Sequence, residues 1–458
     1  MQDREPDFWQ NLRTELASGR QWIDRAVVLA YAVATGLVVV GFTLLSEHAI
    51  EAFRRIRDWG GHGGWITLAW TPALTVAVLW WTRRFVPAAG GSGVPQVIVA
   101  LDDGTPQDRR DWLVSLKLSL HKIGLVSAGL FAGLSIGREG PTVQIGAGLM
   151  QHARRWLSPR SGIDAHDLMV AGAAAGIAAA FNTPLGGVIF AMEQLSRRRS
   201  MTHSALVVAC IVLSGLVAIS VFGNHSYFGR LRVQALDWSL FGPGLLVALA
   251  SGLAGGLFSR LVVASARGLP DGFSRLRARH PLRFAAACAL GVAVIGLVTG
   301  GATAGAGYEP TRAMLEAEAD VPVLYTLLKF CATWLSAWTG VPAGVFAPSL
   351  AIGAGIGNDV AWLVGLAGEA AIPLIALGMV GFLAATTQGP ITAFIIVMEM
   401  VAGQAMVLSL MASALLASGV SRMITRPMYL EIATLFVAPP ERPRLLHEPP
   451  DGPHQRPG

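Results

Sequence analysis

Two short stretches that contain glycine and proline decide the fold of this chain. The first reads GREGP at residues 137–141, and the second, 207 residues further on, reads GVFAP at residues 344–348. No charged residue follows Glu139 until Arg154. Because a carboxylate inside a long apolar stretch is costly, it marks a functional site by default. We therefore expect Glu139 to act in an ion pathway that is built between two related helix starts.

The composition is that of a polytopic, all-α membrane protein. The chain has 458 residues, of which 53% are hydrophobic and 14% are charged, whereas soluble domains carry about 25% charged residues. The net charge of +6 comes largely from arginine clusters. The bias of cytoplasmic loops toward Lys and Arg explains these clusters without a nucleic-acid partner. Runs that can cross the ~30 Å hydrocarbon core as helices are residues 26–45, 65–81, 206–222, 240–258 and 284–300.

The chain divides into three parts. Residues 1–25 form a charged, amphipathic segment that is too acidic for a signal peptide, and we expect it to be cytoplasmic. Residues 26–437 form the transmembrane domain, with halves of roughly 26–222 and 239–437. The proline-rich tail 438–458 is predicted to be disordered and cytoplasmic. The three cysteines lie in apolar segments, so we expect no disulfide, metal site or cofactor.

The two halves resemble each other. Residues 137–148 and 344–355 share six of twelve positions, and residues 175–194 and 381–400 share six of twenty, at offsets of 207 and 206. Since chance identity in such sequence is roughly one in ten, we favour an internal repeat over shared composition. The repeat pairs Glu193 with Glu399, and we expect both to stabilise helix ends or the cytoplasmic rim.

Glycine and proline interrupt the apolar runs of both halves, at residues 90–95, 137–141, 182–184, 340–348 and 389–390. Proline suits the first turn of a helix, and glycine lets the backbone approach a ligand closely. Corresponding interruptions in two halves indicate a substrate site made of half-helix ends. Free N–H groups at helix starts favour an anion, whereas a cation site needs carbonyls or several carboxylates.

These motifs resemble those of the CLC family of chloride channels and chloride/proton antiporters. GSGVP at 91–95 is similar to the family's GSGIP, 137–141 to its GREGP, 344–348 to its GxFxP, and RPMY at 426–429 to its late segment with an anion-coordinating tyrosine. The resemblance covers roughly residues 25 to 435. It implies an inverted internal repeat with many tilted, broken and re-entrant helices, and a homodimer with one pore per subunit in the bilayer of a bacterial plasma membrane.

The resemblance also implies a role for each motif residue. Ser92 and Tyr429 would donate hydroxyl hydrogen bonds to a central chloride, and Val345 and Phe346 would offer backbone N–H groups. Glu139 would be the gate, an anion that occupies an anion site and leaves when it is protonated or displaced. The other motif positions assigned to anion binding are Gly137, Arg138, Gly140 and Gly344.

Several of these residues could instead have a purely structural role. Ser92 could be a turn residue and Tyr429 an interfacial aromatic. Arg138 could neutralise Glu139, although adjacent residues on a helix do not face each other. Lys122, in the apolar run before Glu139, lies buried near the pathway or extends to the membrane surface.

One position departs from the family pattern. In the exchangers of the family a second glutamate relays the proton, and Gln194 stands at that position here. Because an amide does not exchange protons in this pH range, we predict uncoupled, channel-like chloride conduction gated by Glu139. The alternative is a chloride/proton antiporter with a water-mediated proton route, and a third, less favoured hypothesis is a fluoride exporter. We find no motif of an intramembrane enzyme, and chloride is the expected substrate.

Overall fold

The computed structural model describes residues 19–159, 161–196, 204–223, 228, 238–317, 321 and 324–437. Within these residues the chain is helical and forms only isolated bridges, with no strand. Eight of the described helices are long and apolar enough to cross a membrane. All five predicted spans lie in helices, namely α2 (Gly19–Arg57), α3 (Gly63–Phe85), α10 (Ser204–Phe222), α11 (Phe241–Arg267) and α13 (Pro281–Val298).

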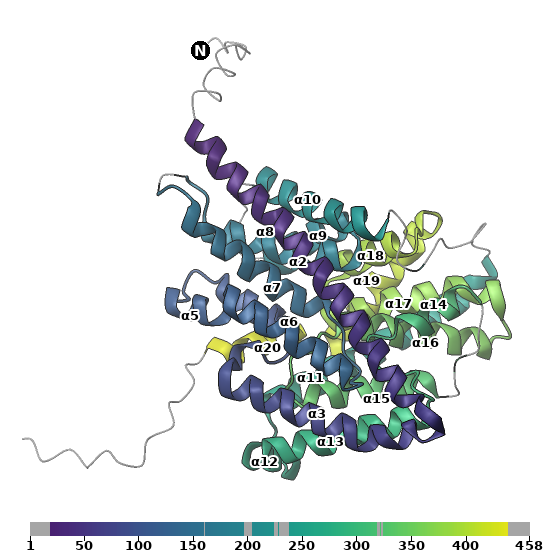
Figure 1. The fold of residues 1–458 in the computed structure, drawn as a ribbon. Coiled ribbons are helices and arrows are strands. Elements are labelled where there is room, and N and C mark those ends of the chain that lie inside the picture. The colour runs from purple at the N-terminus through teal and green to yellow at the C-terminus, as the bar shows by residue number, and fades with distance from the viewer. Residues whose placement is uncertain are drawn as a thin grey trace, which may run out of the picture.

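Helix α2 runs diagonally across the molecule (Figure 1) and continues through the predicted boundary at residue 25 without a break. The predicted disordered tail lies outside the described residues. The other helices are α4 (Val94–Ala100), α5 (Gln107–Leu113), α6 (Leu116–Phe131), α7 (Glu139–Ala153), α8 (Ala165–Phe181), α9 (Pro184–Phe190), α12 (Gly272–Arg279), α14 (Tyr308–Leu315), α15 (Tyr325–Trp338), α16 (Phe346–Leu363), α17 (Ile372–Thr387), α18 (Pro390–Met400), α19 (Val407–Ile424) and α20 (Met428–Val437).

Every predicted interruption is a helix start. Helices α4, α7, α9, α16 and α18 begin within or directly after the glycine–proline motifs. Proline stands in the first turn of α4, α9 and α18, where its missing N–H would have no partner inside the helix in any case. The broken helices that we predicted from these motifs are therefore confirmed.

The internal repeat is confirmed by the packing. Helix α7 packs on α8 as α16 packs on α17, and α10 contacts α2 and α8 as α19 contacts α11 and α17. Glycines permit these close crossings at equivalent places. A Cβ atom on Gly146 would lie 2.1 Å from the carbonyl oxygen of Gly172, and one on Gly353 would lie 2.3 Å from that of Gly378. Small residues allow the backbones of membrane helices to approach in this way.

The two halves meet at Gly137 and Gly344. The N–H of Gly137 donates to the carbonyl of Gly344 at 2.8 Å, and the N–H of Gly344 donates to the carbonyl of Gly137 at 2.9 Å. Gly344 needs to be glycine, because a Cβ atom there would lie 2.7 Å from the carbonyl oxygen of Gly137 and 2.9 Å from Cδ of Pro141.

Two further backbone hydrogen bonds are related to each other by the internal repeat. The N–H of Gly91 donates to the carbonyl of Val341 at 3.1 Å, and the N–H of Gly305 donates to that of Leu134 at 3.0 Å. Val341 stands 207 residues after Leu134, as Gly344 does after Gly137. The loop Gly305-Ala306-Gly307 is therefore the structural counterpart of Gly91-Ser92-Gly93.

We expect Gly344→Ala to destabilise the protein by about 1–3 kcal/mol, because the added methyl group overpacks a backbone contact that cannot move away. Thermal unfolding in detergent, followed by loss of the monodisperse peak in size-exclusion chromatography, measures the effect. Gly419→Ala is the control, since no atom lies within 4 Å of its Cβ position. Equal melting temperatures for the two variants would contradict the argument.

Candidate functional site

The starts of α4, α7 and α16 converge on one buried point. A Cβ atom on Gly140 would lie 2.3 Å from Oγ of Ser92 and 3.4 Å from Cα of Gly344. The three motifs that we singled out in the sequence are therefore in contact, although they lie up to 252 residues apart. The absence of a side chain at Gly140 is what lets the Ser92 hydroxyl approach the first turn of α7.

Tyr429 joins this point from α20. Its side chain is 2% exposed, which excludes the interfacial position, and its ring stacks on that of Phe346 with centroids 5.8 Å apart. The Tyr429 hydroxyl lies beside the Ser92 hydroxyl, within range of a side-chain interaction, and within electrostatic range of Glu139. Neither the Ser92 nor the Tyr429 hydroxyl is hydrogen-bonded to another group of the described residues. A hydroxyl can donate one hydrogen bond, so both groups are available as donors to a bound ligand.

The carboxylate of Glu139 is fully buried at the first residue of α7. Its Oε1 accepts a hydrogen bond from the hydroxyl of Tyr308, the first residue of α14. Its Oε2 has no hydrogen-bond partner among the described residues, and it lies 2.5 Å from the position that a Cβ atom on Gly137 would take. The gate predicted from the sequence therefore lies against the bond pair that joins the two halves.

Arg138 is closer to Glu139 than we expected. Its Nε lies 3.8 Å from Oε1 of Glu139, although Arg138 is the N-cap residue of α7 and has right-handed helical backbone angles. The same guanidinium donates to Oε1 of Glu47 at 3.2 Å and to the carbonyl of Thr43 at 3.3 Å. It also lies 5.4 Å from the ring centre of Tyr308. Arg138 is therefore shared between two carboxylates.

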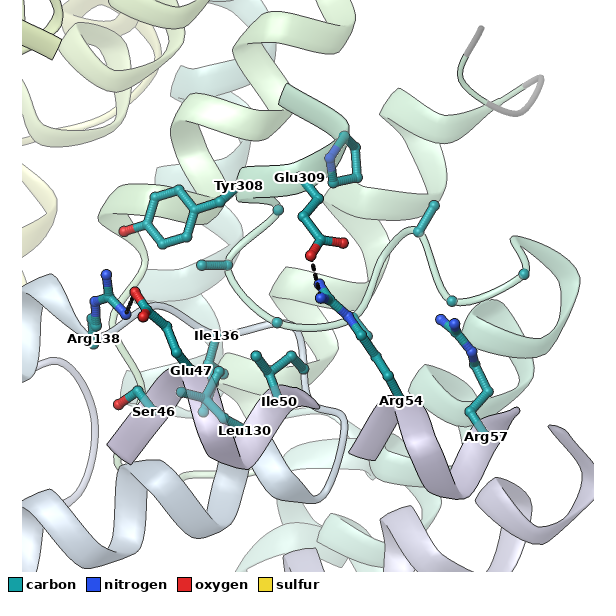
Figure 2. A pocket seen from close by; sticks show the side chains of 18 residues that line it. Ser46, Glu47, Ile50, Arg54, Arg57, Leu130, Ile136, Arg138, Tyr308 and Glu309 are labelled. Atoms are coloured by element: carbon teal, nitrogen blue, oxygen red, sulfur yellow. Dashed lines mark hydrogen bonds and ion pairs between the residues drawn. The ribbon is translucent and has the colours of Figure 1, made fainter. Parts of the chain in front are cut away.

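A cavity of about 280 Å³ lies beside Tyr308 and Arg138 (Figure 2), and its lining also includes Arg54 and residues 300–302 and 304–307. Its arginines are paired, since Arg138 contacts Glu47 and Arg54 contacts Glu309. The positive charges of Arg138 and Arg54 in this cavity are therefore offset by carboxylates.

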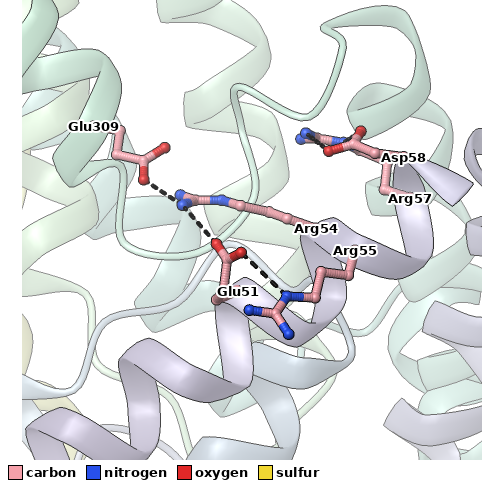
Figure 3. Close-up of polar contacts among 6 residues, drawn as sticks. All are labelled: Glu51, Arg54, Arg55, Arg57, Asp58 and Glu309. Carbon is pink, nitrogen blue, oxygen red and sulfur yellow. Dashed lines mark hydrogen bonds and ion pairs between the residues drawn. The ribbon is translucent and has the colours of Figure 1, made fainter.

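Acidic and basic side chains alternate at the rim of this cavity (Figure 3). Arg54 also lies 3.9 Å from Glu51, and Arg55 lies 3.4 Å from the same residue. Arg57 donates to Asp58 at 2.7 and 2.9 Å, and this hydrogen bonding lowers the pKa of the Asp58 carboxyl. Asp58 therefore stays ionised at neutral pH and offsets the charge of Arg57.

A second cavity of about 280 Å³ adjoins Ser92 and Tyr429. Ser92, Val345 and Tyr429 line it, together with Gly91 and Arg277. Ser92 and Tyr429 thus face one cavity, Tyr308 and Arg138 face the other, and Glu139 is close to both pairs.

Two buried lysines hold the loops beside the site. Lys122 is fully buried, which decides the question that the sequence left open. Its Nζ donates to the carbonyl of Gly91 at 3.2 Å and to Oε1 of Gln144 at 2.5 Å. Lys329 stands 207 residues after Lys122, and its Nζ donates to the carbonyls of Thr303 and Gly305 at 2.9 and 2.8 Å. Our sequence analysis missed Lys329, which the repeat offset identifies.

Our sequence analysis also missed Tyr308. The loop before it, GAG at residues 305–307, is the counterpart of GSG at 91–93, and both are followed by a proline within three residues. The two loops lie 214 residues apart, whereas the corresponding helices lie 207 residues apart. A search at a fixed spacing of 207 therefore does not align the loops. A search for the motif itself would have found the position.

Glu193 and Glu399 cap helices, as we expected. The carboxylate of Glu193 accepts from the N–H groups of Ile391 and Thr392 at the start of α18, at 3.2 and 2.8 Å. That of Glu399 accepts from Leu185 and Gly186 at the start of α9, at 3.3 and 2.8 Å. The two halves thus exchange reciprocal caps.

Gln194 lies in a π-helical turn at residues 191–195, next to this pair of caps. Its side chain is buried and packs on the backbone before α18, because a Cβ atom on Gly389 would lie 1.9 Å from Nε2 of Gln194. The corresponding part of the second half is a regular α-helix. π-turns occur frequently at functional sites.

Comparisons with known proteins agree with this arrangement. Residues 74–422 match the model of the voltage gated chloride channel family. The chain is 29% identical over 441 residues to the H(+)/Cl(-) exchange transporter ClcA of Cronobacter sakazakii, covering 90% of this chain and 89% of that protein. It is 30% identical over 349 residues to the transporter of the same name from Vibrio cholerae serotype O1, covering 73% and 71%.

Solved structures share the fold. A slow cyanobacterial Cl-/H+ antiporter superposes with a TM-score of 0.76 at 21% identity, over 90% of this chain and 98% of that one. A CLC-type fluoride/proton antiporter gives a TM-score of 0.70 at 21% identity, over 92% and 98%.

The fold and the family match together define a multi-pass membrane protein that transports anions. The chain belongs to the voltage gated chloride channel family, which is the CLC family that its motifs resemble.

We expect Glu193→Ala and Glu399→Ala each to lower the free energy of unfolding by about 1 kcal/mol, since each removes the acceptor for a helix start. Both variants should retain chloride transport per folded protein. Thermal unfolding in detergent and chloride efflux from liposomes measure the two effects. If Glu193→Ala abolished transport at unchanged stability while Glu399→Ala did not, Glu193 would have a role beyond the cap.

Proposed function

We propose that this protein exchanges chloride for protons across the membrane, and that Glu139 is both the gate and the proton carrier. The observation that carries the proposal is the buried Glu139 carboxylate beside the unpaired hydroxyls of Ser92 and Tyr429. A carboxylate and a chloride compete for the same donors. When the carboxylate takes up a proton it loses its charge, leaves the donors to chloride and carries the proton to the other side.

The donor set suits a halide. The hydroxyls of Ser92 and Tyr429 are neutral donors, and the first N–H groups of α16, at Val345 and Phe346, have no partner within the helix. Neutral donors hold an anion without the strong binding of a full positive charge. Gly137, Gly140 and Gly344 contribute by letting the backbone come close. Arg138, which is engaged with Glu47 and Glu139, contributes charge to the cavity beside Tyr308.

The proton must reach Glu139 without the usual inner glutamate. Gln194 cannot relay it, and Glu193 is engaged in the cap of α18. The proton therefore travels through water in the cavity that Ser92 and Tyr429 line. This is the route that we gave as the alternative in the sequence analysis, and the relatives named as exchangers now favour it over uncoupled conduction.

Uncoupled chloride conduction is the second candidate, and Gln194 is the observation that favours it. A fluoride exporter is less supported, because the likeness to the fluoride/proton antiporter is one of fold. In either mode we propose a homodimer in a bacterial plasma membrane, with both termini in the cytoplasm and with no cofactor.

We expect a chloride gradient to drive protons uphill into liposomes that contain the wild-type protein. The measurement is the external pH of a weakly buffered suspension during chloride efflux, and the reversal potential under opposing gradients gives the ratio. Glu139→Gln should remove the proton movement and make chloride flux independent of pH, because an amide neither ionises nor competes as an anion. Gln194→Glu should increase the coupled proton flux. Chloride flux without proton movement would leave uncoupled conduction as the function.

We expect Ser92→Ala and Tyr429→Phe each to weaken chloride binding about tenfold, since each removes one hydrogen bond to a charged ligand, worth about 1.5 kcal/mol. Isothermal titration with chloride measures the change. Tyr325→Phe is the matched control, because the Tyr325 hydroxyl is buried and has no hydrogen-bond partner among the described residues. Unchanged binding in both site variants would remove the two hydroxyls from the anion site.

A further inference from the structure

We infer that Tyr308 is a positioning residue that latches the Glu139 carboxylate inside the pathway and thereby sets how readily the gate opens. The inference rests on the proposed role of Glu139 as the gate. Its basis is the hydrogen bond from the Tyr308 hydroxyl to Oε1 of Glu139, which joins the first residue of α14 to the first residue of α7.

The loop before Tyr308 is anchored by backbone contacts. Gly305 and Gly307 have φ values of +64° and +87°, which favour glycine. A Cβ atom on Gly307 would lie 2.5 Å from Cβ of Ala351. The Gly305 N–H donates to Leu134, and its carbonyl accepts from Lys329 at 2.8 Å. The loop can therefore place the phenol with little freedom.

Side chains anchor the phenol from the other sides. Glu309, the next residue, is paired with Arg54 of α2, and Figure 2 places both residues on the cavity wall with Tyr308. The Tyr308 ring lies under the guanidinium of Arg138, 5.4 Å from it, and 5.9 Å from the ring of Phe228. Because the phenol is held on several sides, the carboxylate and not the phenol must move when the gate opens.

The internal repeat does not by itself explain why position 308 is a tyrosine. Its counterpart in the first half is Val94, which also follows a positive-φ glycine, Gly93, at a helix start. Valine carries no donor, so the framework does not need a polar residue at this place. The second half alone presents a hydroxyl, and it presents it to the carboxylate at the start of α7.

A hydroxyl that donates to a carboxylate favours the ionised form that stays in the pathway. Removal of the donor therefore makes protonation and departure of the carboxylate easier, and transport should persist to higher pH. The other titratable or charged groups near Glu139 or on the walls beside it stay unchanged in a Tyr308 variant. They are Arg138 before α7, Glu47 and Arg54 on α2, Tyr429 on α20, Lys122 on α6, Lys329 on α15 and Glu309 on α14.

The test uses chloride efflux from liposomes over a range of external pH, with the wild-type protein and with Tyr308→Phe, Glu139→Ala and the double variant. We expect Tyr308→Phe to raise the flux at neutral pH several-fold and to move the half-maximal pH upward by about one unit, the equivalent of a tenfold change. In the Glu139→Ala background the same substitution should change nothing, since the acceptor is absent. Tyr325→Phe is again the matched control and should behave as wild type.

The outcomes separate the two proposals. If Glu139→Ala removes the pH dependence but Tyr308→Phe behaves as wild type, the latch is overturned and the gate stands. If Tyr308→Phe changes flux equally in both backgrounds, Tyr308 acts through the cavity and not through Glu139, which also overturns the latch. A Glu139→Ala variant with unchanged pH dependence would overturn the gate itself. The elution volume in size-exclusion chromatography shows that each variant is folded.

Discussion

The pair of backbone hydrogen bonds between Gly137 and Gly344 is the constraint on which the rest of the structure depends. Non-helical backbone inside a membrane must be paired within the protein, and here the two interruptions pair with each other. Because the bonds are reciprocal, they set α7 and α16 with their first turns together. Glycine is required at Gly344, since a Cβ atom there would lie 2.7 Å from the carbonyl oxygen of Gly137. The anion site follows from this constraint, because both helices start beside it.

The lysines extend the same symmetry outward. Lys122 and Lys329 each donate to the carbonyl of the first glycine of a Gly-x-Gly loop, namely Gly91 and Gly305. Each loop then leads through a second positive-φ glycine into a short helix. A buried amine with carbonyl acceptors satisfies loop carbonyls that have no partner in a helix. One scaffold is therefore built twice, and it presents a loop to the site from each side.

The sequence predicts the scaffold better than the contacts across it. Glycine and proline act locally, so the starts of α7 and α16 can be predicted from the amino-acid sequence. The constant offset of the repeat then relates the two halves. The latch contact joins Tyr308 to Glu139 over 169 residues, and no local pattern links two such positions. Arg138 illustrates the same limit. The rule for adjacent helical residues failed there because two long side chains can approach each other even from neighbouring positions, and whether they do so depends on tertiary packing.

Function arises where the two copies differ. Ser92 has Ala306 as its counterpart, and Val94 has Tyr308. The first copy thus places a hydroxyl without a hydrogen-bond partner beside the site, and the second places a hydroxyl that is bonded to Glu139. A fully symmetric pore would hold an anion equally from both sides and would have no preferred position for a gate. Under the proposed function, the donor of the second copy would hold the carboxylate, and the donors of the first copy would remain for chloride. Departure of the carboxylate would then exchange one anion for another, which is the step that transport requires.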